Sequence, residues 1–348
     1  MNVKNDDSMR YVAGIDGGGT KTACMIGDNK GNILSYVITD GSNHQISGLS
    51  YTVRNVSKSI RLACSKAGIS QKQLSFIYMG MAGADLPEDI ACLTTVFKKE
   101  FNKVPFEIVN DRWNAFACEA NDTGAVSICG TGGSMAVRGR GGKIYSTRAL
   151  RYILGNYGGG NHLSEMALHY AFRCDEHTGL YTRLVEELPK FCNCSSMDEL
   201  AKEIYTSNYV FYKKYNIPKL VFRLAAEGDT ICKYIINNMG LEMGSMIAGL
   251  IKKAGLENEA VPVVLSGTLY VTDSHRQLIQ PFEQELRKTV PSAILQVVTC
   301  PPVVGAVFMA LDKIGVTLTW EEKQRMKSYD KADESHESDE WPEDNEKI

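Results

Sequence analysis

Two glycine-rich turns carry the residue types that bind phosphate groups in proteins, and the first lies close to the N-terminus. Residues 16–21 read DGGGTK. Consecutive glycines let the backbone turn tightly and bring its N–H groups against an anion, while the threonine adds a hydroxyl donor and the lysine a positive charge. The spacing is not that of a GxxxxGK[ST] loop, and a plain glycine hairpin is the alternative. The candidate phosphate contacts are Gly17, Gly18, Gly19, Thr20 and Lys21.

A second turn of this kind lies further along the chain, where residues 130–134 read GTGGS. Like the first, it stands between two short apolar runs, so the two turns together predict two loops that grip one polyphosphate. Asp16 ends the run before the first turn, and a carboxylate there is suited to holding Mg²⁺ through water. The candidate phosphate contacts of the second turn are Gly130, Thr131 and Gly132.

Asp111 is the candidate general base. It follows the apolar run 106–109 and precedes a helical pattern, and a carboxylate at the carboxyl edge of such a sheet points into the ligand crevice. From there it could accept a proton from a substrate hydroxyl during phosphoryl transfer. The alternative is that Asp111 caps the following helix, a position that Asp favours strongly. On spacing alone the capping role is favoured.

The elements that must position these residues alternate between strands and helices. Short apolar or alternating runs predict strands, and apolar residues at helical spacing predict helices. The predicted strands are 11–15, 22–26, 32–39, 76–81, 106–109, 125–129, 134–138, 143–147, 261–265 and 295–298. The predicted helices are 47–67, 87–101, 113–120, several between 163 and 254, and 303–314.

Each half of the chain opens in the same way, with a strand, a glycine turn, a second strand, a hairpin and a third strand. We interpret this order as an internal structural repeat. Three consecutive antiparallel strands would then start each sheet, and the pattern as a whole predicts an α/β protein.

Length and composition limit the function classes. A chain of 348 residues is long enough for two domains, and 44% apolar with 23% charged residues is typical of a folded soluble protein. The net charge of -3 gives no sign of a nucleic-acid partner. No run of eighteen apolar residues and no hydrophobic signal core occur, so we expect no membrane partner and a cytoplasmic location.

The two ends of the chain differ from the rest in composition. Residues 1–10 are polar and are predicted to form a flexible lead. Residues 328–348 carry nine acidic and two basic side chains, a net charge of -7, which leaves +4 for the remainder because the whole chain carries -3. We expect this segment to be a disordered acidic tail.

Seven motifs then follow one another between residues 11 and 316. They are GIDGGGTKT (14–22), GSNH (41–44), MGMAGAD (79–85), VNDRWNAF (109–116), ICGTGGS (128–134), VVLSGT (263–268) and PPVVGAVFMAL (301–311). In these motifs and in their order the chain resembles the sugar kinase–actin–Hsp70 superfamily. Within it, the chain resembles the group of N-acetylglucosamine kinases and BadF/BadG/BcrA/BcrD ATPases.

The resemblance implies two ribonuclease-H-like lobes of the actin-like ATPase type that flank a nucleotide cleft. The N-terminal lobe would span residues 11–120. The C-terminal lobe, with a helical insertion, would span 121–320, and the last helix could pack back on the first lobe. ATP would lie between the two glycine turns, with Ser266 and Gly267 beside the adenosine.

The implied activity is that of an ATP- and Mg²⁺-dependent kinase acting on the 6-hydroxyl of an amino sugar of N-acetylglucosamine type or a related hexose. Asp111 matches the catalytic base of such kinases, and Asn43 matches the asparagine that contacts the amino sugar. His44, Gly83 and Asn156 are the other expected sugar contacts. Kinases of this type are often dimers, so a homodimer is left open.

One segment departs from the pattern of these kinases and keeps a second function open. Where they carry a GDEGS-like segment, whose acidic residue contacts sugar hydroxyls, residues 155–161 read GNYGGGN. Asn156 and Tyr157 replace the two acidic residues, and an amide can bond hydroxyls but cannot supply charge. The alternative is a BadF-type nucleotide-binding ATPase or regulatory module without sugar kinase activity.

Ten cysteines without a framework spacing fit a reducing compartment. Cys174, His177, Cys192 and Cys194 include residue types that bind zinc, but their spacing is irregular. Ordinary reduced thiols are the favoured interpretation.

Overall fold

The computed structural model describes residues 8–120, 122–149, 152–207, 215–329 and 335–336. It divides into two compact units, which are described separately. Unit 1 consists of Met1–Cys118 and Cys300–Ile348, and unit 2 of Glu119–Thr299. Most of the segment predicted to be an acidic tail, and most of the predicted N-terminal lead, lie outside the described residues.

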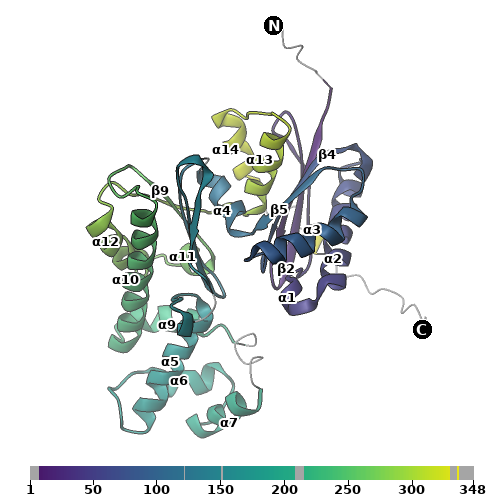
Figure 1. The fold of residues 1–348 in the computed structure, drawn as a ribbon. Coiled ribbons are helices and arrows are strands. Elements are labelled where there is room, and N and C mark those ends of the chain that lie inside the picture. The colour runs from purple at the N-terminus through teal and green to yellow at the C-terminus, as the bar shows by residue number, and fades with distance from the viewer. Residues whose placement is uncertain (1–7, 121, 150–151, 208–214, 330–334, 337–348) are drawn as a thin grey trace, which may run out of the picture. The chain divides into compact units, whose positions relative to one another are not determined.

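The sheet of unit 1 begins with three antiparallel strands and continues with parallel ones (Figure 1). In the described residues its spatial order is β11 (Ser335–His336), β3 (Ile33–Asp40), β2 (Lys21–Asp28), β1 (Tyr11–Gly17), β4 (Leu74–Met81) and β5 (Phe106–Asn110). The central strand β1 pairs antiparallel with β2 and parallel with β4. The carboxyl ends of β1, β4 and β5 therefore meet at one edge of the sheet.

Helices cover both faces of this sheet, and the alternation of side chains along β1 shows why. Ala13 and Ile15 are buried in the core that faces α2 (Leu49–Lys66) and α3 (Pro87–Glu100). Gly14, between them, packs against α13 (Val303–Lys313). A Cβ added to Gly14 would lie 2.7 Å from the backbone nitrogen of Val307. Figure 1 shows α13 on the side of the sheet opposite to α2 and α3. The remaining helical segments of the unit are α1 (His44–Ser47), η1 (Gln71–Gln73), α4 (Arg112–Glu119) and α14 (Trp320–Lys327).

The sheet of unit 2 repeats the opening of the first. Strands β6, β7 and β8 pair antiparallel, and β9 and β10 continue the sheet in parallel. The spatial order in the described residues is β10 (Ile294–Val297), β9 (Pro262–Ser266), β6 (Gly124–Cys129), β7 (Gly133–Arg138) and β8 (Ile144–Ser146). The predicted internal repeat is therefore present in the strand topology.

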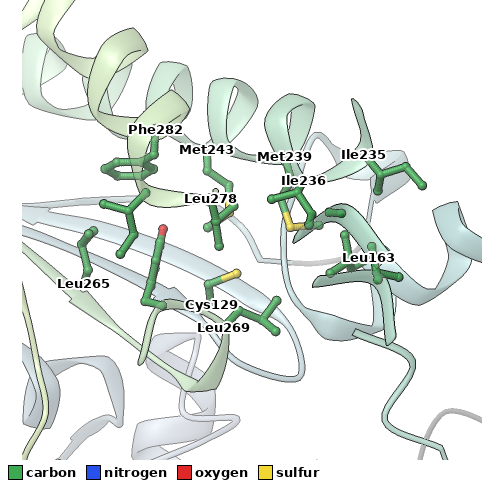
Figure 2. Close-up of a cluster of buried hydrophobic side chains, with 14 of the residues drawn as sticks. Cys129, Leu163, Ile235, Ile236, Met239, Met243, Leu265, Leu269, Leu278 and Phe282 are labelled. Atoms are coloured by element: carbon green, nitrogen blue, oxygen red, sulfur yellow. The ribbon is translucent and has the colours of Figure 1, made fainter. Parts of the chain in front are cut away.

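A large apolar core fills the space between this sheet and the long helix α10 (Thr230–Lys253) with its partner α12 (Ile279–Thr289). Figure 2 shows Met239, Met243 and Phe282 facing strand residues such as Cys129. Each of these four side chains is at most 1% exposed, and burial of such area is the main stabilising contribution in folding. The other helical segments of the unit are η2 (Arg140–Gly142), η3 (Tyr152–Leu154), α5 (Gly160–Asp175), α6 (Leu184–Phe191), α7 (Met197–Ser207), α9 (Ile217–Ala226) and α11 (Thr268–Val271).

One predicted helix begins later than expected, and one observed helix was not predicted. The helix predicted over 47–67 begins at Leu49, because Gly48, at φ +82°, separates it from the short α1. Helix α14 was not predicted; it begins at a capping box in which Thr319 and Glu322 bond each other's backbone N–H groups. None of the helices in the described part of the chain is long and apolar enough to cross a membrane.

Candidate active site

The first glycine turn connects β1 to β2 at the carboxyl edge of the unit 1 sheet. The amide of Gly18 donates to the carbonyl of Lys21 (2.8 Å), and its carbonyl accepts from the amide of Ser42 (2.9 Å). Within the described chain, the amides of Gly19 and Thr20 make no intramolecular hydrogen bond. Both residues are exposed, so two N–H donors are available to an anion.

Asp16 precedes this turn at the end of β1 and is held by an amide from α4. Asn114 Nδ2 donates to Asp16 Oδ1 (2.8 Å) and to the carbonyl of Ile15 (3.0 Å). Burial raises the pKa of Asp16 to about 6, against the opposing effects of the Asn114 hydrogen bond and the positive charge of Lys21. A carboxylate with a raised pKa at a strand end is a functional-site candidate.

Asp111 lies at the start of α4, next to the end of β5, in the same unit. Burial, together with the negative charges of Asp16 and Asp85, raises the pKa of Asp111 to about 7, while Arg112 opposes the rise. Asn114 donates its amide to the carbonyl of Asp111 (3.0 Å). The Asp111 carboxylate also accepts a hydrogen bond from the backbone N–H of Arg112, the first residue of α4, and this contact likewise opposes the rise of its pKa.

The residues on either side of Asp111 in sequence, Asn110 and Arg112, form a polar network with Asp85. Arg112 is 6% exposed, and its Nε donates to Asn110 Oδ1 (2.5 Å) while its NH2 nitrogen lies 3.3 Å from Asp85 Oδ1. Asn110 Nδ2 donates to the same Asp85 oxygen (2.8 Å). Asp85 thus draws the guanidinium group toward itself.

Three of the residues expected to contact a sugar, Asn43, His44 and Gly83, lie near one another in unit 1, whereas Asn156 lies in unit 2. Asn43 caps α1 by accepting from the amide of Gln45 (2.9 Å), and Gln45 Nε2 donates to the carbonyl of Gly83 (3.0 Å). Gly83 has φ +84°, and a Cβ there would come within 2.6 Å of Asn43 Oδ1. His44 Nε2 lies 3.3 Å from Asp89 Oδ1, and its buried Nδ1 has no hydrogen-bond partner among the described residues.

The second glycine turn is packed against the start of α5 in unit 2. The amides of Gly160 and Asn161 donate to the carbonyls of Gly130 (2.8 Å) and Thr131 (3.0 Å). Gly159 has φ +95°, and a Cβ there would lie 2.4 Å from the carbonyl carbon of Gly132. The carbonyls of this turn are therefore used within the unit, while the described residues contain no acceptor for the amides of Thr131 and Gly132.

The segment that departs from the kinase pattern is built into this turn. Asn156 Nδ2 donates to the carbonyl of Gly133 (3.0 Å), and its buried Oδ1 has no partner in the described chain. The hydroxyl of Tyr157 accepts from Asn238 Nδ2 (2.8 Å), and its ring lies 4.1 Å from that of His162. Both replacement side chains thus make contacts inside unit 2.

Ser266 ends β9, and Gly267 follows it beside the second turn, directly before helix α11. Gly267 has φ +110°, and a Cβ added to it would lie 2.5 Å from the carbonyl carbon of Cys129. The following helix α11 lines a cavity of about 670 Å³ together with α9. Apolar and charged residues share its walls, among them Thr268, Leu269, Phe222, Lys219 and His275.

In the described residues no group of three or more His, Cys, Asp or Glu side chains is arranged to hold a metal ion. Cys174, Cys192 and Cys194 form no disulfide there. Mg²⁺ is usually held by only one or two carboxylates and keeps several waters. Asp16, with Oδ2 unbonded to any described residue, fits that requirement.

Sequence reasoning missed several of these residues. Asn114 was read only as part of a helix, and the Arg112–Asp85 pair joins two motifs that are distant in sequence. The signal for Asn114 was a polar side chain inside the apolar helical pattern of residues 112–118, which is buried throughout. The cavity lined by α11 and α9 combines residues 216–227 with residues 268–277, and no local pattern indicates it.

Comparisons with known proteins place the chain in a family. A model of the BadF/BadG/BcrA/BcrD ATPase family matches residues 13–310. The N-acetylmuramic acid/N-acetylglucosamine kinase of Clostridium acetobutylicum is 25% identical over 304 residues, which are 87% of this chain and 98% of that protein. The N-acetyl-D-glucosamine kinase of Dictyostelium discoideum is 26% identical over 321 residues, 88% of this chain and 99% of that protein.

Among solved structures, a candidate N-acetylglucosamine kinase from Chromobacterium violaceum has a TM-score of 0.66 at 16% identity, over 86% of this chain and 99% of that one. The fold is thus the α/β fold of two ribonuclease-H-like units of the actin-like ATPase type, as the sequence predicted. The chain belongs to the BadF/BadG/BcrA/BcrD ATPase family.

Proposed function

We propose that this protein is an ATP-dependent sugar kinase that phosphorylates the 6-hydroxyl of an amino sugar of N-acetylglucosamine type or a related hexose. Its curated relatives are named as kinases of such sugars and match nearly their whole length. The observation that carries the proposal is the Asp111 carboxylate, which follows the end of β5 and whose pKa burial raises to about 7. A general base with a pKa near the working pH is the most effective.

The nucleotide would be held by groups that the fold leaves available. The amides of Gly19 and Thr20 in unit 1, and of Thr131 and Gly132 in unit 2, are donors suited to phosphate oxygens. Ser266 and Gly267 would contact the adenosine, since helix α11, which follows them, lines a cavity large enough for a purine base.

Asp16 would hold Mg²⁺ through water, and Lys21 would add positive charge at the phosphates. When bound, Mg²⁺ offsets the charge of the phosphoryl oxygens. The raised pKa of Asp16 fits such a role, because a carboxylate that burial makes costly to ionise gains most from a nearby cation.

In the reaction, Asp111 would accept the proton of the 6-hydroxyl as its oxygen attacks the γ-phosphorus of ATP. The bond from that phosphorus to the β,γ-bridging oxygen breaks, and ADP leaves with the negative charge. The proton stays on Asp111 until it is released to solvent. The backbone donors of the turns position the phosphoryl group, so most of the rate would come from orientation and charge stabilisation.

The acceptor would lie near Asn43, His44 and Gly83 in unit 1. The unpartnered Nδ1 of His44 and the polar side chain of Asn43 suit an acceptor with several hydroxyl or amide groups. Asn156 is the further sugar contact that we expect in unit 2, through its unpartnered Oδ1. The net charge of -3 gives no sign of a nucleic-acid partner. The homodimer that kinases of this type often form would be tested by the mass in solution.

The second candidate is a nucleotide-binding regulatory module without kinase activity. One observation favours it: Asn156 and Tyr157 use polar groups inside unit 2, where kinases of this kind present acidic side chains to the sugar. Unfolding temperature separates the two candidates. A ligand present at about 100 times its Kd adds about 2.7 kcal/mol of stability, a shift of about 5 °C or more.

A kinase should be stabilised by one sugar of a panel of hexoses and amino sugars, and more strongly when AMPPNP is also present. Stabilisation by AMPPNP alone, across the whole panel, would favour the regulatory module. The position of transfer is then read by phosphorus–proton NMR of the product, where coupling to the C6 protons is expected. Coupling to any other ring proton would contradict the 6-hydroxyl assignment.

A further inference from the structure

Asn114 is a buried polar side chain near the proposed reaction centre, and the mechanism above assigns it no role. It lies in the first turn of α4 and is fully buried. Its Nδ2 donates to both the carbonyl of Ile15 and the Oδ1 of Asp16. Its backbone amide donates to the carbonyl of Asp111. One residue therefore contacts both carboxylate-bearing positions.

The surrounding backbone is shaped to admit this side chain. Gly80 of β4 pairs in register with Asp16, and a Cβ on Gly80 would come within 2.2 Å of the Asn114 amide. A Cβ on Gly305 of α13 would come within 1.9 Å of the Asn114 carbonyl oxygen. Glycine at position 80 leaves room for the Asn114 side chain next to β4, and glycine at position 305 leaves room for the Asn114 backbone next to α13.

The orientation of the amide is determined by its neighbours. Nδ2 faces two oxygens, and the reverse orientation would place Oδ1 against both of them. In the observed orientation Oδ1 is buried without a partner among the described residues, which costs stability. An apolar residue would avoid that cost, but it would leave Asp16 Oδ1 and the Ile15 carbonyl without this donor.

We propose that Asn114 is a positioning residue of the phosphoryl-transfer site. Its amide holds Asp16 Oδ1, and thereby turns Asp16 Oδ2 toward the hydrated Mg²⁺ of the bound nucleotide. The proposal rests on the function proposed above, and it concerns the coupling between Mg²⁺ and nucleotide rather than the transfer of a proton.

The test measures AMPPNP binding by calorimetry in excess Mg²⁺ and in EDTA, for the full chain and its variants. In Asn114→Ala the affinity in EDTA should stay within about twofold of the original. The gain in affinity on adding Mg²⁺ should fall about tenfold, the effect of one hydrogen bond to a charged group. Sugar turnover should fall through kcat, with the KM for the sugar unchanged.

A second variant reaches the same contact from the other side. Gly80→Ala keeps Asn114 in the chain but displaces its amide, so it should lose the Mg²⁺ effect as well. The matched control is Asn32→Ala, which removes an amide–carboxylate hydrogen bond to Asp28 (2.9 Å). Asp28 lies at the opposite end of the β1–β2 hairpin, paired with Tyr11, so this control should keep the Mg²⁺ effect.

The outcomes distinguish this inference from the proposed function. If Asn114→Ala or Gly80→Ala folds and keeps the original Mg²⁺ effect, Asn114 has only a structural role and the inference is overturned, while the kinase stands. If the original protein shows no Mg²⁺ effect at all, the inference and the Asp16 assignment are both overturned. If the Mg²⁺ effect is present and is lost in the variants, but no sugar is phosphorylated, Asn114 is supported and the kinase is not.

Discussion

At the scale of single residues, the proposed chemistry depends on two carboxylates, those of Asp16 and Asp111, that burial makes difficult to ionise. Burial is the largest cause of the raised pKa of both Asp16 and Asp111, and the charge of Asp16 raises that of Asp111 further. Environments that push pKa values toward neutrality are typical of acid–base sites. Asp16 accepts from the side chain of Asn114 and has Lys21 nearby, whereas Asp111 accepts from the backbone of Arg112 and has its guanidinium group nearby.

The raised pKa of Asp111 predicts a pH profile. The base form is the deprotonated one, so activity should be lost as the pH falls through the pKa and regained as it rises. With a pKa of about 7, kcat/KM should increase about tenfold between pH 6 and pH 8. The measurement is ADP release at low sugar concentration across that range.

Asp85→Asn is the matched variant for this profile. The negative charge of Asp85 raises the pKa of Asp111, and its loss also releases Arg112 from the 3.3 Å contact. Both effects stabilise ionised Asp111, so the acid limb should move to lower pH. A profile that is flat in the original protein, or that moves to higher pH in the variant, would be incompatible with Asp111 as the base.

At the scale of elements, the glycines in and beside the two turns allow different close contacts. In the first turn Gly17 admits Ser42 and Met81, whose side chains would lie within 2.7 Å of a Cβ. In the second, Gly159 allows α5 to start directly against the carbonyls of the turn. The turns thus serve as close contacts between backbone segments as well as sources of N–H donors.

A substitution in the second turn should weaken nucleotide binding. Gly159→Ala places a Cβ 2.4 Å from the Gly132 carbonyl carbon, at φ +95°, so the turn must move. Strain of this kind costs about 1–3 kcal/mol, and we expect a loss of AMPPNP affinity of about tenfold or more, measured by calorimetry. The control Gly249→Ala lies in α10 with nothing within 4 Å; it should keep the affinity and gain up to about 1 kcal/mol of helix stability.

Unchanged AMPPNP affinity in a folded Gly159→Ala protein would mean that the second turn does not hold the nucleotide. A loss of affinity in Gly249→Ala as well would show that the method responds to any added methyl group in unit 2.

Elements were predictable from sequence where local signals agree. The strands around both turns were recognised because apolar runs end at glycine clusters, and the structure places β1, β2, β6 and β7 there. The break at Gly48 was not recognised, since it depends on Asn43 capping a separate short helix. Helix α14 was missed because its apolar content is low, and only its capping box indicates its start.

The candidate site was only partly predictable. Asp16, Asp111 and the glycines stand at strand ends, where local spacing already suggests chemistry. Asn114, Arg112 and Asp85 acquire their contacts through tertiary structure, because β1, β4 and α4 meet only after folding. The contacts of Asn156 and Tyr157 inside unit 2 likewise depend on β7 and α10.

At the scale of the whole molecule, one topology occurs twice with different additions. Each unit starts with three antiparallel strands and continues in parallel, and the chain returns to unit 1 after residue 299. Unit 1 contains both carboxylates and the expected sugar contacts from 41–44 and 79–85. Unit 2 contains the second turn and the cavity lined by α11 and α9.

The most direct test is ADP release by the original protein and by Asp111→Asn, with Mg-ATP and a panel of hexoses and amino sugars. We predict turnover that depends on one sugar, and a fall in kcat of about 100-fold or more in the variant, with AMPPNP affinity retained. Turnover close to the original in Asp111→Asn would contradict the base assignment. Intact nucleotide binding without turnover on any sugar would contradict the kinase itself.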